Sequence, residues 1–282
     1  MCGIVGGTSE RNILPILVEG LRRLEYRGYD SAGVAFKKNG TISITKNKGR
    51  VEQLAKKLNL KENQSNLGIA HTRWATHGIP SEKNAHPHAS KNIFVVHNGI
   101  IENHNELKAQ LKAEGIRFST QTDTEVIAHL IKTYTEKGQS FEKAVFNTIK
   151  RLKGAYALGI IDKNNPEQVI GVRNQSPLVL GKGFQENFIA SDVMALSPVT
   201  NKFVYLDDGQ VALLNQQKTV VKNASNQTVR VKTHEVDSNA YTTDLQGHNH
   251  FMEKEIFEQP AAVKDSIEGR LAKNETQEGI FG

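Results

Sequence analysis

The sequence predicts an α+β fold in which helices and strands occupy separate layers. Short runs typical of strands outnumber the amphipathic segments typical of helices, and the two kinds do not take turns regularly along the chain. Regular strand–helix alternation would instead favour a doubly wound parallel sheet. The 282 residues, 38% of them apolar and 23% charged, also suffice to bury a sizeable core.

Four segments have the apolar spacing of helices that pack on one face. Two of them begin with a capping-box pattern, in which Asn103 precedes Glu106 by three residues and Thr122 precedes Glu125. Gly115 predicts the end of the first of these two helices. The expected helices are residues 13–25, 103–114, 122–134 and 140–152.

Short apolar or alternating runs predict many strands, and the last third of the domain is especially rich in them. Glycines flank Ile4 and Val5, which suits a buried strand beginning at the N-terminus. The stretch Asp207-Asp208-Gly209-Gln210 is typical of a turn between two strands. The other expected strands are residues 31–37, 41–46, 67–73, 93–98, 155–161, 168–173, 177–181, 187–191, 203–206, 210–214 and 229–236.

Near residue 240 this pattern weakens. A helical stretch over 251–269 and an acidic polar end follow, with too little apolar surface for a domain of their own. We expect one domain over residues 1–238. Residues 239–282 are expected to be a linker or docking segment of a longer protein, cut naturally or by engineering.

Charge and hydropathy restrict the partners. The net charge is +6, but Lys and Arg are scattered, without a basic run or an aromatic-interleaved motif, so we expect no nucleic acid. No apolar run reaches about 18 residues, so we expect no membrane span. The first seven residues lack the basic and apolar regions of a secretory signal, which favours the cytoplasm.

The single cysteine stands at position 2. It excludes an intrachain disulfide framework and a Cys-rich zinc site. After removal of Met1, Cys2 would carry both a thiol and a free α-amine, that is, a nucleophile with its own base. The alternative is an accidental cysteine in an ordinary first strand, and position alone does not decide between the two.

Patterns for other enzyme classes are weak or missing. The sequence contains no GxGxxG, Walker A, HExxH or GxSxG motif. The pairs in His86-Pro87-His88 and His248-Asn249-His250 lack cysteine partners and an i, i+4 arrangement backed by a glutamate. We therefore expect neither a metal nor an organic cofactor.

Three further positions suit the recognition of an amino acid and its reaction. Arg73, at a strand end before a glycine-containing loop, could grip a carboxylate bidentately, although taken alone it is better explained by a salt bridge beside a core Trp74. Asn98 and Gly99 offer the two N–H donors of an oxyanion hole, or simply a turn. Asp123 could bind an ammonium group or cap a helix.

Ten short motifs occur in order along the chain. They are CGIVG at 2–6, LEYRGYDSAG at 24–33, HTRWATHG at 71–78, NAHPH at 84–88, HNGIIENH at 97–104, TDTEV at 122–126, GAYAL at 154–158, SPLVLG at 176–181, FIASD at 188–192 and EKEIFEQP at 253–260. Together they resemble the N-terminal glutaminase domain of the glutamine:fructose-6-phosphate amidotransferase family, a group of N-terminal-nucleophile amidotransferases.

The resemblance implies a four-layer αββα sandwich, with two antiparallel sheets between helical layers. It also implies a reaction, the hydrolysis of L-glutamine to glutamate and ammonia through a cysteinyl thioester. At matching positions Cys2 is the nucleophile and its α-amine the base. Asn98 and Gly99 form the oxyanion hole, and Arg27 supports the pocket near the nucleophile.

The resemblance assigns the remaining pocket residues to the substrate. Arg73 holds the glutamine carboxylate and Asp123 its amine. Thr76 and His77 line a loop that covers the site, and Trp74 anchors that loop.

In the family the ammonia serves to convert fructose 6-phosphate to glucosamine 6-phosphate, in a sugar isomerase half that would begin within residues 239–282. We expect that half to be absent from this chain. The alternatives are a free-standing subunit that feeds a separate partner, a sister amidotransferase with a phosphoribosyl or asparagine-forming domain, and a non-catalytic glutamine-binding regulatory module. The motif at 253–260 argues against the sister enzymes, and the sequence leaves a homodimer open.

Overall fold

The computed structural model describes residues 2–236, 248, 251–267, 271–272 and 275–276. The chain divides into two compact units, residues 1–241 and 242–282. The domain boundary expected at residue 238 lies outside the described residues, so it stays a prediction.

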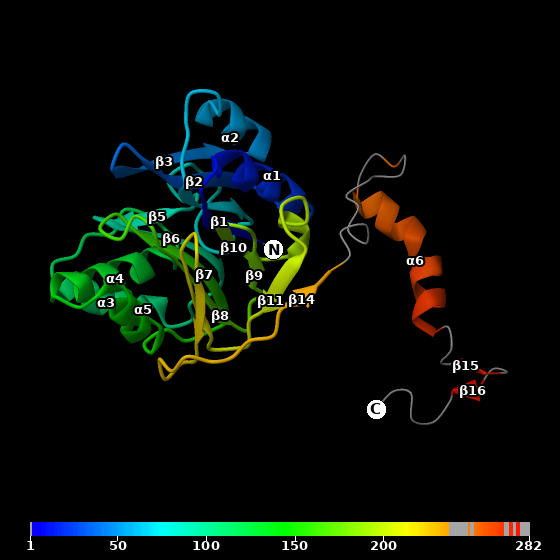
Figure 1. Cartoon of the computed structure of the whole chain (residues 1–282). Helices are drawn as coiled ribbons and strands as arrows, with labels where there is room; N and C mark the ends of the chain where they lie inside the picture. The colour runs from blue at the N-terminus through cyan, green and yellow to red at the C-terminus, as the bar shows by residue number, and fades with distance from the viewer. Residues whose placement is uncertain (1, 237–247, 249–250, 268–270, 273–274, 277–282) are drawn as a thin grey trace. The chain divides into compact units, whose positions relative to one another are not determined.

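The first unit contains two antiparallel sheets (Figure 1). The eight-stranded sheet has the order β14-β11-β9-β10-β1-β4-β2-β3, and the six-stranded sheet has the order β13-β12-β8-β7-β6-β5. The strands are β1 (Gly3–Ser9), β2 (Ser31–Lys38), β3 (Thr41–Lys48), β4 (Leu67–Arg73), β5 (His88–Ser90), β6 (Ile93–Gly99), β7 (Tyr156–Asp162), β8 (Val169–Asn174), β9 (Val179–Lys182), β10 (Glu186–Ala190), β11 (Lys202–Tyr205), β12 (Val211–Leu214), β13 (Thr219–Lys222) and β14 (His234–Glu235).

Helices cover the outer face of each sheet. One hydrophobic cluster joins α1 and α2 to the eight-stranded sheet, and another joins α3, α4 and α5 to the six-stranded sheet. The helices are α1 (Leu14–Leu24), α2 (Val51–Leu58), α3 (His104–Ala113), α4 (Glu125–Glu136) and α5 (Phe141–Ile149), with short 3₁₀ turns η1 (Glu25–Arg27) and η2 (Val193–Ala195). This arrangement confirms the expected αββα sandwich.

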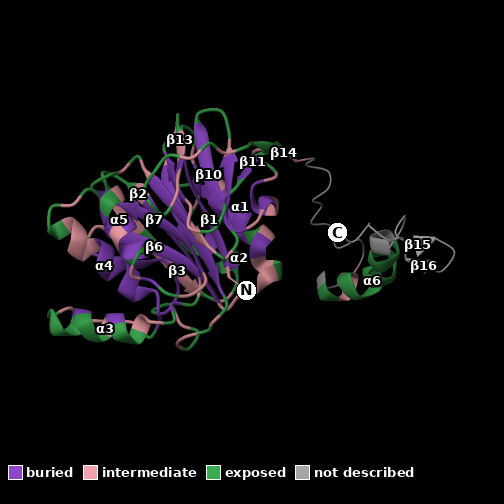
Figure 2. Ribbon diagram, turned by 90° about the horizontal axis from the view of Figure 1, so that it is seen from below, coloured by how far each residue is buried: buried purple, intermediate pink, exposed green. Residues whose placement is uncertain are grey.

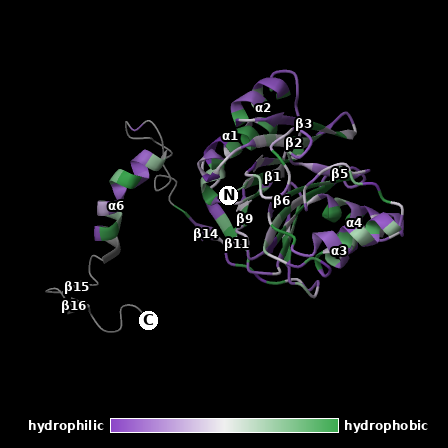
Figure 3. Cartoon of the chain, turned by 180° about the vertical axis from the view of Figure 1, so that it is seen from behind, coloured by the Kyte–Doolittle hydropathy of each residue, from purple (hydrophilic) through white to green (hydrophobic). Residues whose placement is uncertain are grey.

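Neighbouring residues of the central strands belong to different layers, because successive strand side chains point to opposite faces. Val5 packs with α1 and α2, whereas Ile4 packs between the sheets. In β6, Val95 packs against α3 to α5 and Val96 packs between the sheets. Both faces of these strands are therefore buried, as the purple strands of Figure 2 show. Hydrophilic residues are prominent on the outer helices and loops (Figure 3).

Both capping-box expectations were wrong. The Asn103 side chain donates to the Arg151 carbonyl at 2.9 Å and accepts from the Lys153 amide at 3.0 Å instead. Thr124, not Thr122, precedes α4, and no side-chain cap forms there. The Glu125 carboxylate accepts hydrogen bonds from the residue 119–120 segment. Hydrogen bonds to other parts of the chain therefore replaced the expected helix caps. The predicted helix end at Gly115, with a φ of 82°, is confirmed.

The strand prediction over 229–236 was largely wrong, since only the two residues of β14 pair there as a named strand. The sequence analysis also missed α2, β5 and β13. The strands β5 and β13 are short, with three and four residues. Helix α2, in contrast, buries Val51, Leu54, Ala55 and Leu58 at helical spacing, so its periodicity was a signal that the prediction overlooked. The turn at 207–210 is confirmed by the Gln210 amide donating to the Asp207 carbonyl at 3.2 Å, and it carries the chain from one sheet to the other.

The second unit contains α6 (Phe251–Ile267), β15 (Leu271–Ala272) and β16 (Glu275–Thr276). Helix α6 covers the described part of the helical stretch expected over 251–269. In the described portion of the chain, no helix combines the length and the hydropathy that crossing a membrane requires.

Candidate active site

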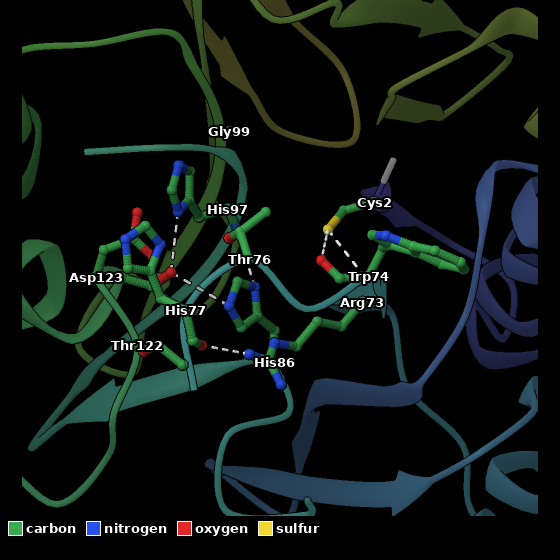
Figure 4. A pocket seen from close by; sticks show the side chains of 11 residues that line it. Cys2, Arg73, Trp74, Thr76, His77, His86, His97, Gly99, Thr122 and Asp123 are labelled. Atoms are coloured by element: carbon green, nitrogen blue, oxygen red, sulfur yellow. Dashed lines mark hydrogen bonds between the residues drawn. The ribbon is translucent and has the colours of Figure 1, made fainter. Parts of the chain in front are cut away.

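A pocket opens where the start of β1 meets the ends of β4 and β6 (Figure 4). In the register of the eight-stranded sheet Gly3 faces Thr72, so Cys2 lies beside the end of β4. The pocket is lined by Cys2, Arg73, Trp74, Thr76, His77, His86, His97, Gly99, Thr122, Asp123 and Thr124. The structure thus brings together seven of the nine predicted residues, while Asn98 and Arg27 contact Cys2 from outside the lining.

The Cys2 thiol is half-buried and contacts the backbone of the following loop. Its Sγ accepts a hydrogen bond from the Trp74 amide at 3.1 Å and donates to the Trp74 carbonyl at 3.4 Å. Burial raises the pKa of the Cys2 thiol, and the amide hydrogen bond opposes this rise. At rest the thiol is therefore held mainly in its protonated form, and a nearby base is needed to make it a nucleophile.

The carbonyl group of Cys2 is held from two sides. Asn98 Nδ2 donates to it at 3.1 Å and Arg27 Nε at 3.2 Å. Arg27 lies in η1 and also forms an ion pair with Asp192 at 3.7 Å. These contacts fix the backbone next to the thiol.

Gly99 ends β6 with a φ of 121°, which side-chain-bearing residues rarely adopt. A Cβ atom here would lie 2.0 Å from the Ala155 carbonyl oxygen. The chain turns at this point, and the Ile100 amide donates to that same carbonyl at 3.0 Å. Only glycine fits, and the backbone beside it is accessible to a ligand in the pocket.

Arg73 is buried, and its guanidinium points away from Cys2 (Figure 4). It donates to the carbonyl oxygens of His77, Gly78 at 2.9 Å and Ile79 at 3.4 Å. An ion pair with Asp30 spans 3.7 Å. The guanidinium therefore holds the loop that follows β4 by its backbone, and these carbonyls occupy the donors that a carboxylate ligand would use.

Asp123 is buried just before α4. Its Oδ2 accepts a hydrogen bond from the Ile101 amide at 2.8 Å, which ties it to the segment after β6. A buried carboxylate at the pocket wall is suited to a cationic group of a ligand.

Trp74 is 55% exposed, so the alternative of a core tryptophan was wrong. Its ring lies on Gly28, where a Cβ atom would come within 2.3 Å of the indole. The two loops that carry these residues are therefore in contact.

Four buried histidines form a cluster of rings at the pocket wall, and two of them, His86 and His97, line the pocket. Neighbouring ring centroids lie 4.1 Å apart for His71 and His86 and 4.6 Å apart for His86 and His88. Burial lowers the pKa of all four, including His97. His86 Nε2 and His97 Nδ1 both meet the hydroxyl of Thr124, at 3.2 and 2.9 Å.

The sequence analysis considered His86 and His88 only as metal ligands and missed their packing role. Within the described residues, no group of three or more His, Cys, Asp or Glu side chains is arranged to hold a metal ion. His250 of the second histidine pair lies outside the described residues. The signal for the ring cluster was the concentration of histidines in HTRWATHG, NAHPH and HNGIIENH.

Comparison with known proteins agrees with this fold. Residues 58–253 match the glutamine amidotransferase domain family, and the chain belongs to this family.

Curated relatives match over the full length of this chain. The chain is 49% identical over 281 residues to a glutamine–fructose-6-phosphate aminotransferase (isomerizing) of Acinetobacter baylyi and 46% identical over 285 residues to that of Escherichia coli. Both matches cover 100% of this chain and 46% of the relative. The chain thus spans about half the length of the curated relatives it matches.

Among solved structures, the chain resembles a glutamine phosphoribosylpyrophosphate amidotransferase from B. subtilis, with a TM-score of 0.70 and 26% identity. The match covers 81% of this chain and 50% of that one. A glutamine aminotransferase class-II domain protein from Silicibacter pomeroyi shares the fold at a TM-score of 0.53 and 14% identity.

Proposed function

We propose that this domain hydrolyses L-glutamine to glutamate and ammonia through a thioester on Cys2. The observation that carries the proposal is one pocket that holds a thiol, a buried arginine and a buried carboxylate, namely Cys2, Arg73 and Asp123. A γ-amide substrate with an α-carboxylate and an α-ammonium group needs these three functions. Membership of the glutamine amidotransferase domain family supports the same substrate.

The reaction begins with the α-amine of Cys2, freed by removal of Met1. The amine takes the thiol proton, and the thiolate attacks the side-chain amide carbon of glutamine. The resulting oxyanion accepts hydrogen bonds from Asn98 Nδ2 and the Gly99 amide. The oxyanion competes with the Cys2 carbonyl for one Nδ2 hydrogen, because in the free domain Asn98 Nδ2 donates to that carbonyl.

The tetrahedral intermediate then collapses. The carbon–nitrogen bond breaks, the α-ammonium returns its proton to the leaving nitrogen, and ammonia departs. Water attacks the γ-glutamyl thioester in the same oxyanion hole, which releases glutamate and restores the Cys2 thiol.

Substrate binding rearranges the loop after β4. The glutamine carboxylate replaces the loop carbonyls on the Arg73 guanidinium, and the α-ammonium binds Asp123. Thr76 and His77 belong to this loop and move with it, while the Trp74 ring anchors the loop on Gly28.

For the whole protein we propose that the ammonia converts fructose 6-phosphate to glucosamine 6-phosphate in a sugar isomerase half. The support comes from the glutamine–fructose-6-phosphate aminotransferases, which are 46 to 49% identical over the full chain, against 26% identity for the phosphoribosylpyrophosphate amidotransferase. A cytoplasmic location stays a prediction. The same holds for a homodimer and for the lack of a nucleic-acid partner.

The direct test measures ammonia release from L-glutamine by the purified chain. We expect release from the native protein and none from Cys2→Ala or from a form that retains Met1. Intact mass after incubation with a glutamine-analogue electrophile should show one adduct, which is lost in Cys2→Ala. Glutamine binding without ammonia release or adduct would instead favour the regulatory module, and full activity of Cys2→Ala would refute the mechanism.

A further inference from the structure

The Asn98 side chain is held at both ends by residues of the other sheet. Its Oδ1 lies 3.0 Å from His71 Nε2, on β4. Its Nδ2 donates to the Ser191 hydroxyl at 2.8 Å and to the Cys2 carbonyl at 3.1 Å. An amide with a donor at one end and acceptors at the other has a single favourable orientation.

At the His71 end of the amide, the donor and the acceptor can be assigned. Its Nε2 also lies 2.9 Å from the His97 carbonyl oxygen, which can only accept a hydrogen bond. Nε2 therefore carries the hydrogen and donates to Asn98 Oδ1 as well. The other nitrogen, Nδ1, is buried and has no hydrogen-bond partner among the described residues. Burial lowers the pKa of His71 to about 3, so the ring stays neutral in this tautomer.

The Ser191 end ties the amide to the strand that follows the nucleophile. Ser191 follows β10 directly, and its Oγ accepts from the Ile4 amide at 2.8 Å as well as from Asn98. The Ser191 amide in turn donates to the Ile4 carbonyl at 3.0 Å. The hydroxyl is thus fixed to the backbone two residues after Cys2.

Neither residue belongs to the pocket lining, and both hold Asn98 directly. His71 also contacts two lining residues, with its ring 4.1 Å from that of His86 and its Nε2 on the His97 carbonyl, so a test of its role needs a readout specific to the oxyanion. If the His71 donor were lost, the buried Oδ1 would lack a partner and the amide could turn over. Oδ1 would then face the Cys2 carbonyl and repel an oxyanion instead of stabilising it.

We propose that His71 and Ser191 are positioning residues that clamp the Asn98 amide with Nδ2 toward Cys2, so that the oxyanion hole exists before substrate binds. The proposal rests on the proposed function, because it assumes that Asn98 Nδ2 stabilises the oxyanion of glutamine hydrolysis.

The test compares His71→Gln with His71→Asn. Both variants carry a neutral amide, but only Gln is long enough to place an N–H where Nε2 stands. We expect Gln to keep kcat within about threefold and Asn to lose about 10- to 100-fold, less than removal of a whole oxyanion donor. The KM for glutamine should change by less than about twofold in both, because ground-state binding does not use the oxyanion hole.

A second readout isolates the oxyanion. The γ-aldehyde analogue of glutamine, L-glutamate γ-semialdehyde, adds to the Cys2 thiol and forms a tetrahedral adduct that needs the hole, whereas the product L-glutamate does not. The affinity for the aldehyde should fall in His71→Asn in parallel with kcat, while the affinity for L-glutamate stays constant. Ser191→Ala, which removes one oxygen atom, should show the same pattern at about tenfold.

Equal activity of the two His71 variants, or equal losses for the aldehyde and L-glutamate, would overturn the clamp. If the Asn variant fails to fold in thermal denaturation, Ser191→Ala decides by the same two affinities. A native chain that releases no ammonia refutes the proposed function. If the native chain is active and the variants behave like it, the result refutes the positioning role of His71 and Ser191 but not the proposed function.

Discussion

The Arg73 guanidinium donates a hydrogen bond to the Gly78 carbonyl oxygen at 2.9 Å, and so binds the loop that its own strand leads into. The neighbouring carbonyl oxygens of His77 and Ile79 accept hydrogen bonds from the same guanidinium. One side chain therefore serves two partners in turn, the loop backbone in the free domain and, under the proposed function, the substrate carboxylate. Under the proposed function, this exchange would couple the position of the loop to substrate binding.

Arg73→Lys should raise the KM for glutamine about 10- to 100-fold with a smaller effect on kcat, because lysine keeps the charge but cannot donate bidentately. Steady-state ammonia release measures both constants. Arg11→Lys is the matched control, since Arg11 makes two hydrogen bonds to the Glu186 carboxylate outside the pocket. Its KM should equal the native value, and an unchanged KM in Arg73→Lys would contradict the carboxylate role.

Asp123→Asn separates binding from folding. The asparagine Oδ1 can still accept from the Ile101 amide, so thermal stability should stay near that of the native chain. Loss of the charge should raise the KM for glutamine about 10- to 100-fold, as expected for a charge-assisted hydrogen bond. Asp123→Ala should show the higher KM and also a lower Tm, because it leaves a buried amide unpaired. A native KM in Asp123→Asn would exclude ammonium recognition.

Gly28→Ala should displace the Trp74 ring, because the added Cβ would lie 2.3 Å from the indole. Trp74 is the only tryptophan, so its fluorescence reports this loop alone, and we expect emission to shift to longer wavelength. Gly40→Ala is the control: its φ is also positive, at 73°, but an added Cβ meets no atom within 4 Å among the described residues. It should cost about 1 kcal/mol of stability and leave the emission unchanged. Identical emission spectra in both variants would show that the Trp74 ring does not pack on Gly28.

The histidine cluster predicts loss of stability in mild acid. Above about pH 6.5 these imidazoles are neutral in the folded and the unfolded chain, so they do not affect stability. Below that value the unfolded chain binds protons that the buried rings resist, and each ring lowers the free energy of unfolding by up to about 1.4 kcal/mol per pH unit. Urea unfolding between pH 7.5 and 5.5 measures the slope.

His88→Gln should reduce that slope by one ring's share. His234→Gln, at an exposed position on β14, should leave it unchanged. Burial opposes ionisation of Glu125, but His129 and hydrogen bonds from Thr120 and Ser119 hold its pKa low, so it loses its contribution only below about pH 4.5, outside this window. Equal stability at pH 7.5 and 5.5 would contradict the prediction.

Local patterns were sufficient for the α+β class, for many of its helices and strands and for the main candidate residues, whereas the αββα arrangement was implied by the family resemblance. The strand over 67–73 was predicted at its observed bounds, and α1 lies within the range expected for it. Cys2, Arg73, Asn98 and Asp123 could be singled out because each residue type, beside the start or end of an apolar strand or at the start of a helix, suggests one step of the same chemistry.

Contacts between distant parts of the chain could not be predicted in this way. Ser191 meets Asn98 across 93 residues, and nothing in FIASD indicates a partner in HNGIIENH. Glu125 carried the signal of a capping box, yet its carboxylate binds the segment before it instead. Such side chains have several hydrogen-bonding choices of similar free energy, and the packed environment selects among them.

By itself, the sequence determined the layers and the chemical inventory, because strand alternation, helical spacing and residue type are local properties of the chain. Only the tertiary structure decided that Trp74 lies exposed on Gly28, that loop carbonyls occupy Arg73, and that His71 holds Asn98 from the opposite sheet. The physical reason is distance along the chain. These relationships join strands of two sheets or two separate loops, and their geometry exists only once hydrophobic burial has brought the layers together.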